Sequence, residues 1–117
     1  MNLDNEVLRH VDWKVRFTLA MSKQESLDAY IIGKDNRCEL GKWLHGDGKM
    51  HYSNLKSYEA CLKKHAEFHT EAEKIAVAIN AKKYHKASKM INEDSTFSAV
   101  VNEVYFTVLG LKRDCCF

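Results

Sequence analysis

Residues 53–81, SNLKSYEACLKKHAEFHTEAEKIAVAINA, carry apolar side chains at the spacing of an α-helix. One face holds Leu55, Tyr58, Leu62, His65, Phe68, His69, Ala72, Ile75, Ala76 and Ile79. The opposite face holds Lys56, Glu59, Lys63, Glu67, Glu71 and Lys74. His65 and His69 therefore lie in the buried stripe, one helical turn apart. A buried imidazole must be hydrogen-bonded, neutral or bound to a metal, and two of them on one core face indicate a metal.

A second histidine-bearing helix precedes this one. The pattern predicts a helix from Leu3 or Asp4 to about Met21, with His10 inside its apolar stripe. Trp13 lies one turn beyond His10 and can pack beside its ring. Residues 22–36 have no clear period and contain the turn residues Gly33-Lys34-Asp35-Asn36, which predicts a packed connector with at most a short helical turn.

A short helix bearing a cysteine follows the connector. Asp35 or Asn36 is a suitable N-cap, so Cys38 is expected in the first turn, where a helix N-terminus lowers the pKa of a thiol. The helix should stop at the turn Gly46-Asp47-Gly48.

The last helix is predicted from about Tyr84 to Lys112, with a frayed tail from Arg113 to Phe117. Three long helices and a short one, with no interdomain linker, predict a single all-α domain over residues 1–117. We expect an antiparallel four-helix bundle with one short helix that bears Cys38 and a long connector.

Composition narrows the possible functions. The chain has 117 residues, a net charge of +2, no proline and no apolar run long enough to span a membrane. Its first residues are acidic where a signal peptide is basic, which makes a cytoplasmic protein the expectation. Basic and acidic residues are interleaved, which argues against nucleic acid as a partner. The four cysteines are not spaced as a disulfide framework, so we expect thiols or metal ligands.

Four side chains are candidate ligands of one metal ion, namely His10, Cys38, His65 and His69. Antiparallel helices can bring His10 near the His65–His69 pair, and the short helix can supply the sulfur. Three imidazoles and one thiolate favour tetrahedral Zn²⁺. Trp13 and Trp43 can shield the ion from water. By contrast, Cys61 is expected to be a buried core thiol, and His45, His51 and His85 are expected at the surface.

The motifs His10-x-x-Trp13, Cys38-x-Leu40-Gly41-x-Trp43 and His65-x-x-Phe68-His69 resemble the chemoreceptor zinc-binding domain family over essentially the whole chain. That domain occurs in soluble bacterial chemoreceptors and in some diguanylate cyclases. The resemblance implies a four-helix bundle that binds one zinc ion through the same four residues, often as a homodimer. It further implies a regulatory, non-catalytic module of chemotaxis or cyclic-di-GMP signalling that acts on an output domain in cis or in trans.

Four protein ligands leave no open coordination position, so such a zinc ion should not activate water. We expect Cys38 to be the mobile ligand, released on oxidation or on a change in zinc loading. Three other functions are open to the sequence. A hemerythrin-like di-iron bundle needs inward carboxylates, whereas these glutamates lie on the solvent side. A zinc hydrolase is suggested by His65-Ala66-Glu67-Phe68-His69, but its glutamate is one place late for the His-Glu-x-x-His motif. A purely structural zinc bundle is not distinguished from a sensor.

Overall fold

The structure is a computed structural model that describes residues 2–115. Over that range it contains helices and turns and no strand, which confirms the all-α prediction. In chain order the helices are α1 (Leu3–Val11), α2 (Trp13–Lys23), α3 (Ala29–Ile32), α4 (Glu39–His45), α5 (Asp47–Tyr52), α6 (Lys56–Asn80), α7 (Tyr84–Met90) and α8 (Thr96–Cys115).

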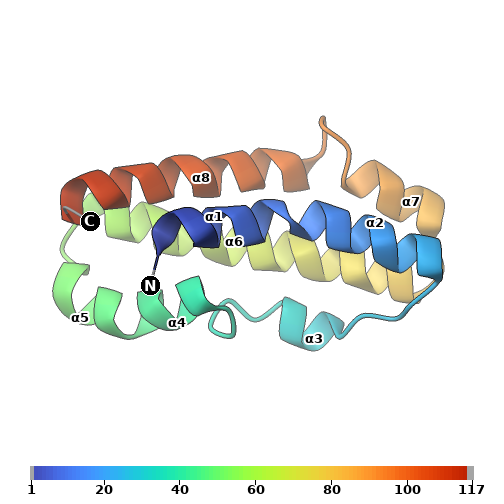
Figure 1. Cartoon of the computed structure of the whole chain (residues 1–117), viewed down its shortest axis with the longest axis horizontal. Helices are drawn as coiled ribbons and strands as arrows, with labels where there is room; N and C mark the ends of the chain where they lie inside the picture. The colour runs from blue at the N-terminus through green and yellow to red at the C-terminus, as the bar shows by residue number, and fades with distance from the viewer. Residues whose placement is uncertain (1, 116–117) are drawn as a thin grey trace.

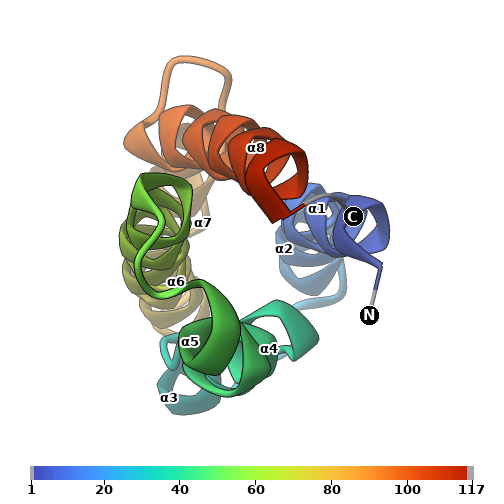
Figure 2. The ribbon, with the colours of Figure 1, turned by 90° about the vertical axis from the view of Figure 1, so that its left-hand side faces the viewer.

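The helices lie lengthwise around a common interior. Helices α1 and α2 form one rod beside α8 and across the interior from α6, and the segment from α3 to α5 returns along α6 on the side away from α8 (Figures 1 and 2). Seen from the end, these segments surround the interior, and α6 packs against α2, α3, α4, α5, α7 and α8 (Figure 2). Among the described residues, none of the helices combines the length and the apolar character that crossing a bilayer requires.

The central helix is the one that the sequence predicts most clearly. Helix α6 covers Lys56–Asn80, within the predicted range 53–81, and its buried face contains His65, Phe68 and His69. Phe68 and Ile75 are completely buried, which is typical of a helix whose apolar stripe faces the core. The two histidines therefore project into the interior rather than into solvent.

The predicted first helix is present, with an interruption at Asp12 between α1 and α2. The backbone N–H of Asp12 still donates to the carbonyl of Leu8 at 2.9 Å, and that of Arg16 donates to Asp12 at 3.1 Å. The rod is therefore continuous in direction. It ends where Gln24 adopts a left-handed conformation with φ of 55°.

The prediction of a single helix from Tyr84 to Lys112 is wrong, because a non-helical segment separates α7 from α8. Asn92 and Ser95 cause this break. The Asn92 side chain accepts from the backbone of Asp94 at 3.0 Å, and the Ser95 hydroxyl accepts from the backbone of Ser98 at 3.1 Å. These side chains compete with the helical hydrogen bonds, and Ser95 caps α8. The predicted fraying is wrong for residues 113–115, which are helical, and Cys116 and Phe117 lie outside the described residues.

The connector and the short helix need two corrections. The connector contains only the four-residue helix α3, as predicted. However, Cys38 is itself the N-cap of α4, rather than a residue of its first turn capped by Asp35 or Asn36. Helix α4 stops at His45 with Gly46 as its C-cap, as predicted, but Asp47 and Gly48 are not turn residues, because α5 starts at Asp47. Gly48 is buried against Trp43, and a Cβ there would lie 2.9 Å from the indole ring, so close packing explains this glycine.

Candidate metal centre

His10, Cys38, His65 and His69 lie together in the interior. His10 comes from α1, Cys38 from the N-cap of α4, and the other two histidines from α6. One donor atom from each residue lies within 4.8 Å of the donor atoms of the other three. The three imidazoles are buried and the thiol is partly exposed. Three segments that are distant in the sequence thus converge on one point.

The Nε2 atom of His65 lies closest to the other three donor atoms. It lies 3.2 Å from Nε2 of His10 and 3.1 Å from Nε2 of His69. The sulfur of Cys38 lies 3.1 Å from Nε2 of His65, 3.6 Å from that of His69 and 3.7 Å from that of His10. A tetrahedron with ordinary Zn–N and Zn–S bond lengths has N–N edges of about 3.3 Å and N–S edges of about 3.6 Å. These five separations lie within about 0.5 Å of those edges, and all four donor atoms lie within 4.8 Å of one another, so the four side chains are close enough to surround one cation.

Hydrogen bonds on the far side of two rings fix their tautomers. The Nδ1–H of His10 donates to the carbonyl of Glu6 at 2.6 Å, and the Nδ1–H of His69 donates to the carbonyl of Ile32 at 2.7 Å. Because a carbonyl only accepts, the proton of each neutral ring is on Nδ1, and the Nε2 lone pair points to the centre.

The protein alone leaves several of these ring nitrogens without a suitable hydrogen-bond partner. Two Nε2 lone pairs face the same Nε2 atom of His65, whose single possible N–H can satisfy only one of them. Moreover, Nδ1 of His65 is buried and has no hydrogen-bond partner within the described part of the chain. A cation at the centre would accept all three lone pairs and leave the proton of His65 on Nδ1. The residues present therefore fit Zn²⁺.

Burial sets the protonation states of the rings. It lowers the pKa of His10 to about 4, against the raising effect of the Glu6 carbonyl, and it lowers the pKa of His65 to about 2. The pKa of His69 is also lowered by burial, although the Ile32 carbonyl opposes the shift. All three imidazoles are therefore neutral near pH 7, which is the form that binds a metal.

The expected lowering of the Cys38 pKa is wrong in direction. Burial raises the pKa of this thiol, and the negative charge of Glu6 adds to the rise. The backbone N–H of Gly41 donates to the sulfur at 3.3 Å and works in the opposite direction, as a helix N-terminus should. Desolvation is the larger effect, so without a cation Cys38 holds its proton more tightly than a free thiol, and binding of a cation must displace that proton.

The geometry explains the spacing Cys38-x-Leu40-Gly41. The side chain of Leu40 is fully buried, and its backbone N–H donates to the carboxylate of Glu6 at 3.2 Å. Gly41 lies where a Cβ would overlap the carbonyl of Asp35 and come within 3.1 Å of the His65 ring. Only glycine allows the start of α4 to approach the ring this closely.

Two residues of the site were not identified from the sequence as neighbours of the ligands. Glu6 is a buried carboxylate that holds both His10, through its carbonyl, and the first turn of α4, through its side chain. Its position four residues before His10 was the available signal. Phe68, which was predicted only as a core residue, packs edge-on against His10, with ring centroids 4.8 Å apart.

The remaining candidates lie outside the cluster. Trp13 packs against Phe17 and lines, together with His10 and His69, an open cavity of about 530 Å³. Trp43 packs against Tyr52 where α4 meets α5. Cys61 is fully buried, and burial raises its pKa to about 11, as expected of a core thiol. The surface histidines are exposed as predicted, namely His45, His51 and His85.

Comparison with known proteins identifies the family. A family model described as the chemoreceptor zinc-binding domain matches residues 10–76, more than half of the chain. The chain belongs to this family. No curated protein and no solved structure gives a match. The matched segment of the chemoreceptor zinc-binding domain contains all four clustered residues but ends within α6, so the family match is shorter than the whole-chain resemblance seen in the motifs.

Proposed function

We propose that this chain is a zinc-binding sensory module of bacterial signalling. One Zn²⁺ ion would be held by His10, Cys38, His65 and His69, and would supply a positive charge that satisfies the four donor atoms. The observation that carries this proposal is the convergence of three Nε2 atoms and one sulfur on a single buried point. Trp13, on the wall of the adjacent cavity, would limit access of water. Trp43 would contribute to the same shielding only indirectly, by fixing the end of α4.

The proposal extends to the architecture and the cellular role. We propose one four-helix antiparallel bundle over residues 1–117, located in the cytoplasm and acting as a homodimer on an output domain of chemotaxis or cyclic-di-GMP type. We assign it no catalytic activity, because four protein ligands would leave no position for a substrate or a reactive water.

We propose Cys38 as the responsive ligand. His65 and His69 stand on the long central helix, and His10 is anchored to the carbonyl of Glu6. Cys38, in contrast, is the N-cap of a seven-residue helix and is the only partly exposed member of the group. Its withdrawal, by oxidation of the sulfur or by a change in zinc loading, would remove the cap of α4 and change how α4 docks.

The rival functions find no support in this geometry. Within residues 2–115 the cluster contains no carboxylate, which a di-iron centre requires. Glu67, the candidate base of a hydrolase, pairs with Lys64 at 3.3 Å on the outer side of α6. A purely structural zinc site differs from a sensor only in whether Cys38 leaves the metal.

The test is a zinc titration of the metal-free chain against a chromophoric chelator, with metal analysis. We expect one zinc per chain, and Cys38→Ser should weaken zinc binding by at least about ten-fold because a thiolate ligand is lost. Cys61→Ala removes a thiol outside the cluster and should leave the affinity unchanged. An unchanged affinity in Cys38→Ser would remove Cys38 from the site. Zinc retained by the wild type after mild peroxide treatment would favour the purely structural role.

A further inference from the structure

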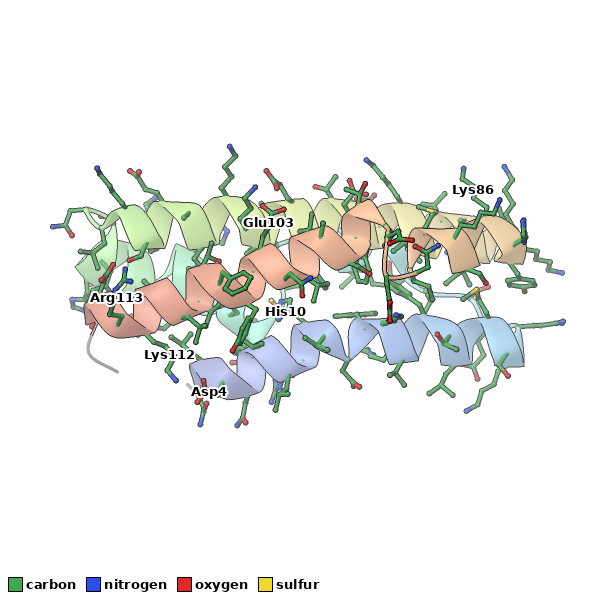
Figure 3. All side chains as sticks on the ribbon, turned by 90° about the horizontal axis from the view of Figure 1, so that it is seen from above. Asp4, His10, Lys86, Glu103, Lys112 and Arg113 are labelled. Atoms are coloured by element: carbon green, nitrogen blue, oxygen red, sulfur yellow. The ribbon has the colours of Figure 1, made fainter. Side chains whose placement is uncertain are left out.

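The open cavity of about 530 Å³ beside the metal centre has a size typical of small-molecule binding sites. One wall comes from α1 and α2, and the other comes from the connector and the start of α4. The walls approach each other at the metal centre, where the sulfur of Cys38 lies 3.7 Å from Nε2 of His10. His10 is on the side of α1 that faces the other helices (Figure 3). The cavity therefore leads from solvent to the candidate ligands.

Two hydrogen-bonded anchors on α6 hold the connector in place. The backbone N–H of Leu27 donates to Oδ1 of Asn80 at 2.7 Å, and Nδ2 of Asn80 donates to the carbonyl of Leu27 at 2.7 Å. Further along the chain, the carbonyl of Ile32 accepts from His69 at 2.7 Å. The wall of the cavity is thus fixed at both ends of α3, and a ligand would bind to a site that is already formed.

Apolar side chains contribute to both walls. Leu27, Ile31 and Ile32 line the cavity from the connector, and Trp13 lines it from α2. Ile31 is 37% exposed, so the core does not account for it. The indole ring of Trp13 packs against Phe17, with ring centroids 5.3 Å apart, which restricts its orientation. A fixed aromatic ring that faces aliphatic side chains suits an organic molecule better than a small inorganic ion.

The cavity is also lined by cations that lack a carboxylate partner. Arg16, Lys34 and Arg37 form no ion pair with any acidic side chain in residues 2–115. The guanidinium carbon of Arg16 lies 3.7 Å from the centroid of the Trp13 ring. Stacking fixes the plane of the guanidinium group and leaves the N–H donors at its edge free to bind an acceptor.

Most carboxylates of the lining are already engaged. Glu6 is buried and accepts a backbone hydrogen bond, Glu39 forms an ion pair on its own helix, and Asp28 caps α3. Asp12 is the one carboxylate of the lining whose side chain has no partner within the described part of the chain. Three cations against one such carboxylate favour an anionic ligand.

The position of Arg16 indicates how such a ligand would lie. Arg16 follows His10 by six residues, or about 9 Å along the rod. A guanidinium group binds a carboxylate through two parallel hydrogen bonds. A ligand with its carboxylate at Arg16 and an apolar body along the cavity would therefore extend toward the metal centre, where it would cover the exposed side of Cys38.

We propose that this cavity binds a small organic anion, a carboxylate on an apolar or aromatic body, between α2 and the connector. Arg16 holds the carboxylate, and Trp13, Leu27 and Ile31 contact the body. The inference rests on the proposed function only for its consequence, because a bound ligand would shield the thiol that we propose as the responsive ligand. Binding itself needs no metal.

A titration of the full chain with benzoate, phenylacetate, 3-phenylpropionate and 4-phenylbutyrate, followed by NMR, tests the site. At millimolar concentration at least one of these acids should shift the indole N–H signal of Trp13 saturably. The signal of Trp43, which lies outside the cavity, should stay unchanged. Acetate, inorganic phosphate and the neutral amide of the same acid should bind more weakly. If none of the four acids shifts Trp13, the proposal is overturned, and equal binding of the amide or of phosphate would overturn the class of ligand.

The contact with Arg16 is tested with matched variants. Arg16→Gln should weaken binding by at least about ten-fold, because a charge-assisted pair of hydrogen bonds is lost, and Arg16→Lys should weaken it less. Lys14→Gln removes the same charge from α2 at an exposed position outside the cavity and should bind as the wild type does. Unchanged circular dichroism shows that each variant folds. Equal affinities of Arg16→Gln and Lys14→Gln would remove Arg16 from the site.

Protection of Cys38 is the second readout. The bound acid should slow the labelling of Cys38 by iodoacetamide in the metal-free chain, measured by peptide mass spectrometry, by the factor that its occupancy predicts. An undiminished rate at saturation would overturn the position of the ligand over the sulfur. A chain that binds the acid and protects Cys38 but takes up no zinc would refute the proposed function and leave this site standing.

Discussion

Acid should destabilise the metal-free chain through its buried histidines. The pKa of His10 is about 4 and that of His65 about 2 in the folded chain, against an ordinary value of 6.5. A lowered pKa in the folded state means that the unfolded chain binds protons first as the pH falls. The stability contributed by these neutral rings is therefore complete above pH 6.5 and is lost as the pH falls below that value.

The size of the effect follows from the two shifts. Between pH 8 and pH 4.5, each ring is expected to lower the free energy of unfolding by about 2.5 kcal/mol. At pH 4.5 the imidazole of the unfolded chain is almost fully protonated, while that of the folded chain is mostly neutral. The two rings together cost about 5 kcal/mol, which is comparable to the whole stability of a small domain. Bound zinc competes with these protons, so the loaded chain should keep its stability to lower pH.

The assay is urea unfolding of metal-free and zinc-loaded chain, followed by circular dichroism over this pH range. Carboxylates also titrate below pH 5, so the informative quantity is the difference from His10→Gln, which removes one titrating ring and leaves an amide that can donate to the Glu6 carbonyl. The variant should lose about 2.5 kcal/mol less than the wild type over the same range. Equal losses in the two metal-free proteins would refute the assignment of His10 as a buried, neutral ring.

Two further substitutions probe the support of the site. Gly41→Ala should destabilise the chain by about 2 kcal/mol and weaken zinc binding, because the new methyl group overlaps the carbonyl of Asp35. Gly110→Ala is the control, because its Cβ would make only ordinary contacts at 3.8 Å. Equal effects of the two substitutions in thermal unfolding would contradict the steric explanation. Glu6→Ala should cost about 2 kcal/mol by leaving the N–H of Leu40 unpaired in the interior, whereas Glu6→Gln keeps an oxygen acceptor and should cost less. Denaturant titration of both variants measures this, and equal costs would show that the hydrogen bond to Leu40 is not the source.

The positions of the candidate ligands could be predicted because each stands in a local pattern. His65 and His69 fall on the buried face of a strongly periodic helix, and His10 falls on the corresponding face of another. Periodicity alone thus places three rings in the interior. The placement of Cys38 opposite them needed a turn signal in addition, and there the prediction located the short helix but shifted its cap by two or three residues.

What could not be predicted depends on contacts between distant segments. The glycines at residues 46 and 48 indicate a turn, so the sequence did not predict α5. Gly48 is instead a helical residue that has no room for a Cβ beside the ring of Trp43. The direction of the Cys38 pKa shift depends on the balance between burial and the N–H of Gly41, and burial is a property of the whole fold. Likewise, the carbonyl of Ile32 that orients His69 lies 37 residues away in the chain.

The hydrogen bonds and packing that hold the three imidazoles differ from those that hold the thiol of Cys38. His10 and His69 are each fixed by a hydrogen bond from Nδ1 to a backbone carbonyl, at 2.6 and 2.7 Å, and His65 is enclosed on the central helix. These rings cannot turn away without breaking a buried hydrogen bond or disturbing the core. Apart from its contacts with the three rings, the sulfur of Cys38 accepts from the backbone N–H of Gly41 at 3.3 Å, and Cys38 caps a helix of seven residues beside an open cavity. This difference in support between the three imidazoles and the thiol favours the proposal that Cys38 is the ligand that leaves, because the other three donors would stay in place when it does.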